Sequence, residues 1–148
     1  TFSKAYGLAG ARIGYGLASP DLIIEFDKIR NHFGNGLLSQ VAAIAALKDQ
    51  NYLSDVVKKI AVGREKLYDT AKINGLSAIP SATNFVAIDC GKDSSFALQV
   101  MNGLLKANVF VRKPMVAPLD RTIRVSVGRD DELDIFDNVL PKVLKTLR

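Results

Sequence analysis

The first fourteen residues contain the densest group of chemically useful side chains in this sequence. Hydroxyls at Thr1 and Ser3, the amine of Lys4 and the guanidinium of Arg12 lie within a dozen positions, with glycines between them. A lysine in a partly enclosed, cation-rich site loses affinity for its proton, and the neutral amine can then attack an aldehyde. Hydroxyls and a planar guanidinium are donors that hold a phosphate dianion. The residues alone leave a second interpretation open, in which Lys4 is an ordinary surface lysine.

Two arginines within apolar segments form the second group of candidates. Arg124 lies in the segment 123–128, which predicts a strand that ends in glycine. An arginine flanked by apolar residues must pair with an acid or face a cleft that holds an anion, and composition alone favours an internal salt bridge. Arg112 follows the apolar run 109–111, and its ordinary interpretation is a solvated charge at the end of a strand.

The elements that must position the first group follow from glycines, caps and apolar spacing. Gly7 and Gly10 discourage a helix before residue 11, and Ser19, Pro20 and Asp21 are typical of a helix start. The pattern predicts a short strand or extended segment over 11–18, a helix from Pro20 to about Arg30 and a loop over 31–36. It then predicts a helix from 37 to a break at 49–51, and a second helix that ends at 74–75.

The remaining residues change to a mixed pattern of short strands and helices. The pattern predicts strands over 77–79 and 84–89, an amphipathic helix over 94–108, strands over 109–112 and 122–127, and a closing helix over 131–147. The sum is a long helical region that leads into a small α+β unit of strands covered by helices. Any domain boundary is expected within residues 50–75.

Charge and hydropathy limit the classes of partner. The 20 basic residues that give a net charge of +5 are interspersed with 15 acidic ones, so no nucleic-acid-binding face is expected. Apolar runs are far shorter than the ~20 residues of a membrane span, so no membrane association is expected.

The few cysteine and histidine residues argue against a metal site. Cys90 is the single cysteine and His32 the single histidine, and we expect a buried thiol on a strand and a solvated loop imidazole. A lone cysteine fits a reducing compartment, so a cytoplasmic location is predicted. The first residue is Thr1 and not methionine, and no secretory signal follows it. We therefore expect the gene to begin further upstream.

The spacing Ser3-Lys4-x-x-Gly7-Leu8-Ala9-Gly10-x-Arg12-x-Gly14 resembles the lysine motif of the class I/II pyridoxal-phosphate-dependent aminotransferases. The resemblance implies that Lys4 carries pyridoxal 5'-phosphate as a Schiff base and that Arg12 binds the cofactor phosphate. It also implies that Thr1 and Ser3 are further phosphate ligands. The fold it implies is α/β, of fold-type I.

Two later segments extend this resemblance over nearly the whole chain. Residues 123–128 are similar to a late strand of the family whose arginine clamps the substrate α-carboxylate, which falls on Arg124. Residues 109–112 are similar to the strand in histidinol-phosphate aminotransferases whose arginine reaches the substrate phosphate, which falls on Arg112. The implied substrates are amines and 2-oxo acids, among them a phosphorylated amine such as histidinol phosphate.

The resemblance also implies a domain division and an assembly. Residues 1–50 correspond to the end of a large cofactor-binding domain, 51–75 to a helical connector and 76–148 to a small C-terminal domain, in a homodimeric enzyme. Several active-site groups of the family precede the lysine, so the 148 residues alone are expected to be weakly active or inactive. Two alternatives stay open: a threonine-phosphate decarboxylase or other class I/II relative, and a non-catalytic basic binding module.

Overall fold

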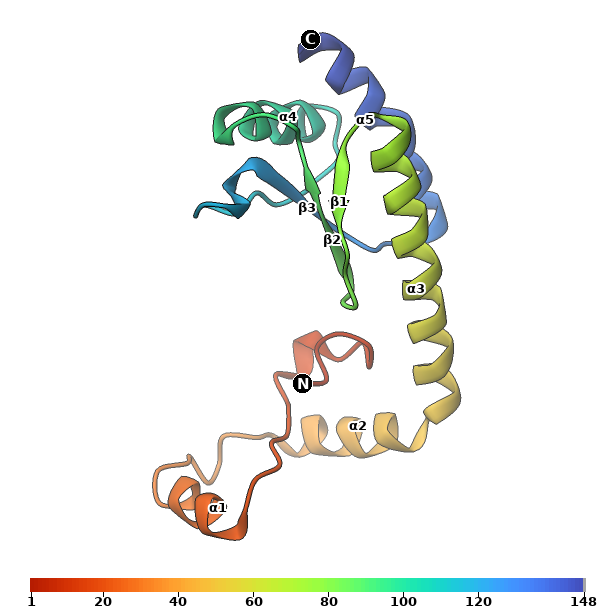
Figure 1. The fold of residues 1–148 in the computed structure, drawn as a ribbon. Helices are drawn as coiled ribbons and strands as arrows, with labels where there is room; N and C mark the ends of the chain where they lie inside the picture. Colours follow the sequence, from red (N-terminus) through yellow and green to blue (C-terminus); the bar gives the residue numbers. More distant parts are fainter. Residues whose placement is uncertain (148) are drawn as a thin grey trace. The chain divides into compact units, whose positions relative to one another are not determined.

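The computed structural model describes residues 1–147, and the chain divides into two compact units, Thr1–Val57 and Lys58–Arg148 (Figure 1). A long helix, α3 (Gln50–Ile73), passes through the division. Lys72 lies in its last turn, and Gly75, with a φ of 72°, follows as the left-handed residue that ends it. The predicted end of this helix at residues 74–75 is confirmed.

The first unit contains the 3-10 turn η1 (Ala9–Ala11) and the helices α1 (Pro20–Asp27) and α2 (Leu37–Lys48). Ser19 and Pro20 take the predicted N-cap and first helical positions, although α1 ends at Asp27 and not near Arg30. The loop over 31–36 and the start of α2 are confirmed, and His32 is exposed in that loop.

Of the two forms predicted for residues 11–18, the strand does not form. Arg12 has a left-handed backbone with a φ of 50°, which no strand contains, and residues 13–19 have no regular structure. The segment makes one inter-segment backbone bond, from Phe2 N–H to the Ile13 carbonyl at 3.2 Å. A strand needs a continuous ladder with a partner strand, and an extended sequence pattern does not supply that partner.

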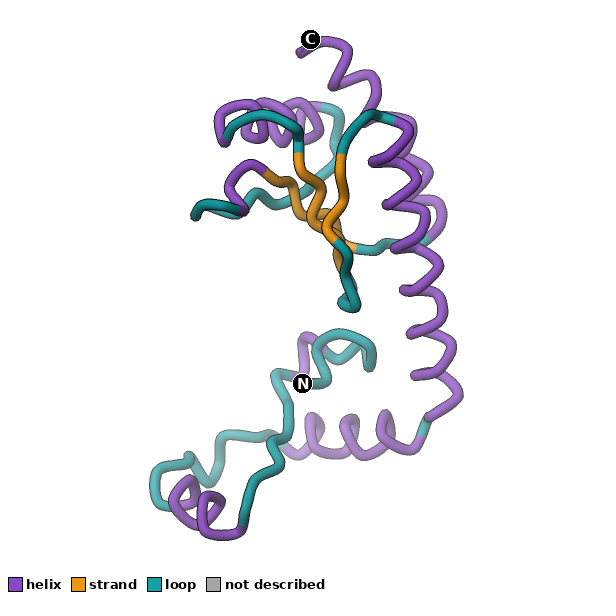
Figure 2. The backbone as a smooth tube through the Cα atoms, viewed as in Figure 1, coloured by secondary structure: helices purple, strands orange, loops and turns teal. Residues whose placement is uncertain are grey.

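The second unit is built on a three-stranded antiparallel sheet in the order β1 (Ser77–Ile79), β2 (Phe85–Asp89), β3 (Thr122–Ser126) (Figure 2). Two helices accompany the sheet, α4 (Ser94–Lys106) and α5 (Asp130–Leu147), and the 3-10 turn η2 (Leu119–Arg121) precedes β3. Asp93 caps α4 by accepting the Phe96 N–H at 2.9 Å. The α+β prediction for this half is confirmed by these elements.

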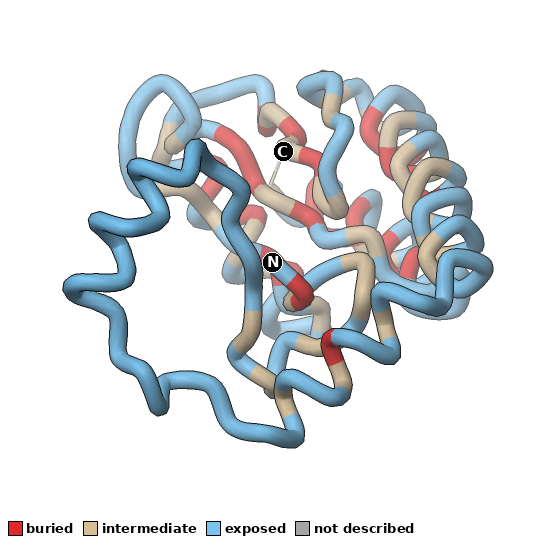
Figure 3. Tube along the Cα trace, turned by 90° about the horizontal axis from the view of Figure 1, so that it is seen from below, coloured by how far each residue is buried: buried red, intermediate tan, exposed pale blue. Residues whose placement is uncertain are grey.

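One face of the sheet is buried in the core of the second unit. Val86, Ile88, Ile123 and Val125 alternate along β2 and β3 and are almost inaccessible to solvent. Figure 3 colours the chain by burial, with buried residues in red. They join buried residues of α3, α4 and α5 in one apolar cluster. The other face of the sheet therefore carries the intervening residues, because strand side chains alternate between faces.

The predicted strand over 109–112 is reduced to a single bridge between Arg112 and Arg124. Asn108, with a φ of 60°, ends the preceding turn in a left-handed conformation, two residues after α4 ends at Lys106. The Val109 N–H then returns to the Leu104 carbonyl at 2.9 Å, as in a Schellman motif. This bond uses the N–H group of Val109 at the start of the segment 109–112, so only Arg112 at its end pairs with β3.

Among the described residues, no helix has the length and apolar character that a membrane crossing requires.

Cys90 is a free, buried thiol directly after β2, as the sequence predicted apart from its place just beyond the strand end. Burial raises the pKa of the Cys90 thiol from 9.0 to about 11, and the negative charge of Asp89 adds to the rise. The thiolate is therefore more costly in the folded chain than in the unfolded chain.

Cys90 should make stability fall with pH in the alkaline range. Below pH 9.0 its contribution is fully present, and between pH 9.0 and 11 the unfolded thiol ionises first, so unfolding releases a proton. We expect a loss of about 2 kcal/mol across that window. Urea unfolding at several pH values should show a shallower alkaline decline for Cys90→Ala. Parallel pH profiles for the two proteins would contradict the assignment.

Candidate active site

The lysine loop, residues 1–14, is anchored by one aromatic side chain. Phe2 is only 2% exposed, and its ring lies 4.9 Å from that of Tyr6 and 5.7 Å from that of Tyr15. The Phe2 carbonyl accepts the Leu8 N–H at 2.9 Å, which closes the loop on itself. The anchor fixes the backbone on both sides of Lys4.

Lys4 begins a tight turn that requires a glycine. The Gly7 N–H donates to the Lys4 carbonyl at 2.8 Å, and Gly7 has a φ of 69°. A Cβ atom at Gly7 would also lie 3.3 Å from the Tyr52 hydroxyl, so the turn is closely packed on that side. Lys4 itself is exposed. The expected partial enclosure of its amine is not provided by the described residues, because the loop packs through Phe2 and not through position 4.

Hydroxyls and a guanidinium of the lysine loop form a donor set. The Thr1 hydroxyl donates to the Ser3 hydroxyl at 3.0 Å and accepts the Ser3 N–H at 3.2 Å. Arg12 Nη1 donates to the Ala9 carbonyl at 2.7 Å, and the Ser39 hydroxyl of α2 donates to the Ala11 carbonyl at 2.8 Å. A guanidinium has five N–H donors, so Arg12 retains donors for an anion. This chemistry fits a phosphate group.

Backbone pairing brings the two predicted substrate-binding arginines together. The Arg112 N–H donates to the Arg124 carbonyl at 3.1 Å, and the Arg124 N–H donates to the Arg112 carbonyl at 2.6 Å. Directly opposed residues of antiparallel segments project their side chains from the same face of a sheet. We call these two residues the arginine pair. It lies on the face of β3 opposite the core.

Arg124 stacks on an aromatic ring and does not form the internal salt bridge that composition favoured. Its guanidinium carbon lies 4.7 Å from the centre of the Phe85 ring. Among residues 1–147, neither arginine of the pair has a carboxylate within ion-pairing distance, whereas Arg121 pairs with Asp89 at 3.0 Å. The salt bridge that composition favoured is therefore absent among the described residues, and the alternative, a cleft that holds an anion, stays a prediction.

Phe85 is the site residue that sequence reasoning missed. A pattern that could have found it is the alternation in β2, where Val86 and Ile88 are core residues and Phe85 falls on the opposite face with Ala87. A large aromatic residue on the less apolar face of a strand indicates a specific contact and not core packing.

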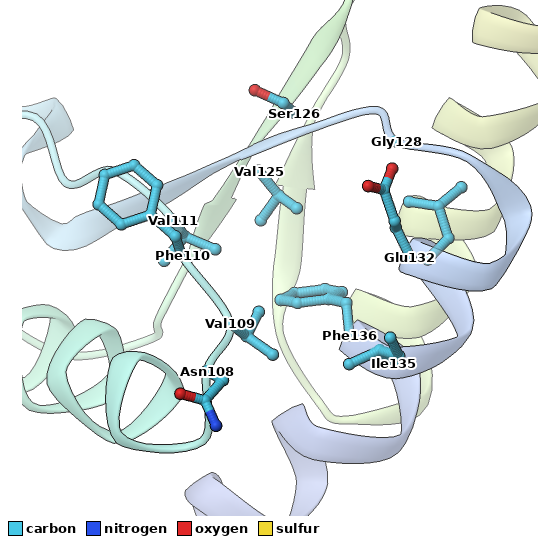
Figure 4. A pocket seen from close by; sticks show the side chains of 11 residues that line it. Asn108, Val109, Phe110, Val111, Val125, Ser126, Gly128, Glu132, Ile135 and Phe136 are labelled. Atoms are coloured by element: carbon cyan, nitrogen blue, oxygen red, sulfur yellow. The ribbon is translucent and has the colours of Figure 1, made fainter.

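A pocket in the second unit does not contain the predicted site. It has a volume of about 440 Å³ and is bounded by α5, the end of β3 and the segment after α4 (Figure 4). Its lining is mostly apolar, with Val109, Val111, Val125, Leu133 and Phe136, and the carboxylate of Glu132 at one side. None of the predicted site residues lines it. No cluster of acidic, histidine or cysteine residues in the described part of the chain could hold a metal ion.

The sheet, helices and lysine loop are those of the fold-type I pyridoxal-phosphate-dependent transferases. A histidinol-phosphate aminotransferase from Sinorhizobium meliloti, solved in complex with pyridoxal-5'-phosphate, is 52% identical with a TM-score of 0.97, over 100% of this chain and 40% of that one. The chain belongs to the aminotransferase class I and II family, whose model matches residues 1–139. The predicted family and fold are confirmed.

Curated relatives support the same placement. Histidinol-phosphate aminotransferase 2 of Carboxydothermus hydrogenoformans is 44% identical over 147 residues, which is 99% of this chain and 40% of the relative. The chain thus spans about two-fifths of the length of these proteins. An L-threonine-O-3-phosphate decarboxylase from Porphyromonas gingivalis, 20% identical with a TM-score of 0.80, shares the fold alone. The roles of Thr1, Ser3, Lys4, Arg12, Arg112 and Arg124, and the domain division, stay predictions.

Neutralising one member of the arginine pair should stabilise the fold while weakening anion binding. Like charges directly opposed across strands are destabilising by a few tenths of a kcal/mol. We expect Arg112→Gln to raise the free energy of unfolding by about 0.5 kcal/mol in low salt without phosphate. Saturating inorganic phosphate should then raise the melting temperature of the wild type more than that of the variant.

Arg121→Gln is the matched control, because its guanidinium already has a carboxylate partner in Asp89. It should not gain stability, and its response to phosphate should equal that of the wild type. Equal phosphate responses of the wild type and Arg112→Gln would show that the arginine pair holds no anion.

Proposed function

We propose that this chain belongs to a pyridoxal-phosphate-dependent aminotransferase that acts on an amino acid or a phosphorylated amine such as histidinol phosphate. The observation that carries the proposal is the lysine loop, in which an exposed amine, two hydroxyls and an arginine lie within one anchored segment. Its match to the aminotransferase family over residues 1–139 supports the same reading. This membership gives no support to a non-catalytic basic module.

Pyridoxal 5'-phosphate is the proposed cofactor, and when bound it supplies the electron-withdrawing ring that stabilises negative charge at the substrate α-carbon. Lys4 Nζ is the proposed point of covalent attachment. Thr1, Ser3 and Arg12 would hold the phosphate, since hydroxyls and a guanidinium are its usual donors. When not bound to the cofactor, the Lys4 Nζ atom would be the base that moves the proton from the substrate α-carbon.

The arginine pair is proposed to bind the anionic groups of the substrate. Arg124 would take the carboxylate or the equivalent group, and Arg112 the phosphate of a phosphorylated amine. The support is that the two like charges lie opposite each other and have no ion-pair partner among residues 1–147. An anion that contacts a guanidinium in two places is oriented as well as held.

The proposal predicts that Lys4 is both the attachment point and the base. The complete gene product should transaminate histidinol phosphate with a 2-oxo acid, and Lys4→Ala should lose about 10²- to 10⁴-fold in rate, as removal of a general base does. Borohydride reduction in the presence of pyridoxal phosphate should fix the cofactor on Lys4, which peptide mass spectrometry can locate. Lys48→Arg, an exposed lysine of the same unit, is the control and should keep both properties.

Labelling spread over many lysines, or full activity in Lys4→Ala, would refute the assignment of Lys4. Release of CO2 from the substrate without amino transfer would instead indicate a decarboxylase.

A homodimer in the cytoplasm is the proposed assembly and location. Its support is the apolar surface of the first unit: α1 has no buried residue, and Leu38 of α2 is 85% exposed. Exposed apolar groups of this size are typical of surfaces that another chain or domain covers.

The dimer proposal predicts that a charge at Leu38 weakens self-association. Light scattering of the complete gene product should give the mass of two chains, and Leu38→Glu should shift the equilibrium toward one chain because a charge is costly in an apolar interface. Leu105→Glu, at a half-exposed leucine of α4 in the other unit, should leave the mass unchanged. A monomeric wild type would exclude the proposal.

A further inference from the structure

Phe85 lies diagonally across the sheet from Arg124. In the register of β2 and β3, Phe85 faces Ser126 and Ala87 faces Arg124. All four side chains leave the same face, and diagonal neighbours are within reach when one is aromatic and the other is long. This is the arrangement that places the Arg124 guanidinium carbon 4.7 Å from the Phe85 ring centre.

The backbone of Phe85 is fixed by the turn that precedes β2. The Ser81 hydroxyl donates to the Phe85 carbonyl at 2.7 Å, and the Ser81 N–H donates to the Tyr68 hydroxyl at 2.8 Å. Arg64 Nη1 donates to the Thr83 carbonyl at 2.9 Å. Tyr68 and Arg64 both belong to α3, so the turn is tied to a helix whose Leu67 is fully buried. The ring therefore stands on a rigid support.

Stacking on a ring and pairing with a carboxylate occupy different parts of an arginine guanidinium. A carboxylate partner occupies the N–H edge of the guanidinium, as Asp89 does for Arg121 Nε at 3.0 Å. An aromatic ring attracts the cation through its face and leaves the N–H edge free. Ala87 lies directly opposite Arg124 on β2, and its methyl group adds little bulk beside the guanidinium. Arg124 is thus held in place while its donors remain open to an anion.

We propose that Phe85 is a positioning residue that holds the Arg124 guanidinium ready for the substrate carboxylate. The inference deepens the proposed function and rests on it for the identity of the anion. Its contribution is preorganisation: the stacked guanidinium loses less freedom when the anion binds.

The test compares Phe85→Leu, which keeps an apolar side chain but removes the ring face, with Phe85→Tyr, which restores the ring. In the complete gene product, Phe85→Leu should raise KM for the amino donor about fivefold, the factor that a contact of about 1 kcal/mol carries, and leave kcat within about twofold. Phe85→Tyr should return KM to near the wild-type value. In an Arg124→Ala background, Phe85→Leu should add nothing further, because the residue that it positions is gone.

Phe96→Leu is the matched control, because Lys92 Nζ lies 4.3 Å from the Phe96 ring centre in the same unit, away from the arginine pair. It should lower stability and leave KM unchanged. A Phe85→Leu variant that behaves in the same way, with lower stability and unchanged KM, would overturn the proposal.

A second readout does not depend on activity. In the wild type the Nε–Hε proton resonance of Arg124 should be shifted by the ring current of Phe85, and titration with inorganic phosphate should move it. Phe85→Leu should abolish the ring-current shift and weaken phosphate binding about fivefold. If the wild type lacks transaminase activity but this result holds, the proposed function fails and the positioning role stands. An unshifted Arg124 resonance in the wild type would overturn the positioning role itself.

Discussion

Two backbone hydrogen bonds between Arg112 and Arg124 set the constraint on which the candidate substrate site depends. They join two like charges across neighbouring segments, an arrangement that costs stability unless an anion is present. The orientation of β3 that produces this arrangement is fixed by the residues on the core-facing side of the sheet. Ile123 and Val125 are buried in the core, so Arg124 between them can only project from the opposite face.

The contrast between Arg121 and Arg124 explains how one small sheet can hold a structural arginine and an available one. Arg121 lies at the end of the sheet, where Asp89 takes its N–H edge. Arg124 lies three residues further along the chain, within β3, where the neighbouring positions of β2 are Phe85 and Ala87. Neither of these side chains can accept a hydrogen bond, so the arginine is held by its face alone. The residue types of β2 therefore decide which guanidinium stays free.

The sequence was a good guide to helices and a poor one to pairing. Pro20 and Gly75 marked helix ends through local chemistry, and the structure agrees. The strand predicted over 109–112, and the strand form of the segment 11–18, failed because a strand is defined by a partner, which no local pattern specifies. The same limit applies to the site. Lys4, Arg12 and Arg124 could be named from motifs. The alternation in β2 could single out Phe85, but its contact with Arg124 becomes visible only when the register of β2 on β3 is known.

The lysine loop shows why its motif combines apolar, glycine and polar positions. Phe2 supplies the buried anchor and Gly7 the left-handed turn, and together they fix the backbone. The Thr1 hydroxyl also accepts the Ser3 N–H, and Arg12 Nη1 donates to the Ala9 carbonyl, while Lys4 remains exposed. Because the conformation is set by Phe2 and Gly7, a substitution at either should move Lys4 relative to its neighbouring donors. A substitution at Lys4 should leave the loop intact, since Lys4 is exposed and the loop is held by Phe2, Gly7 and the hydrogen bonds of Thr1 and Arg12.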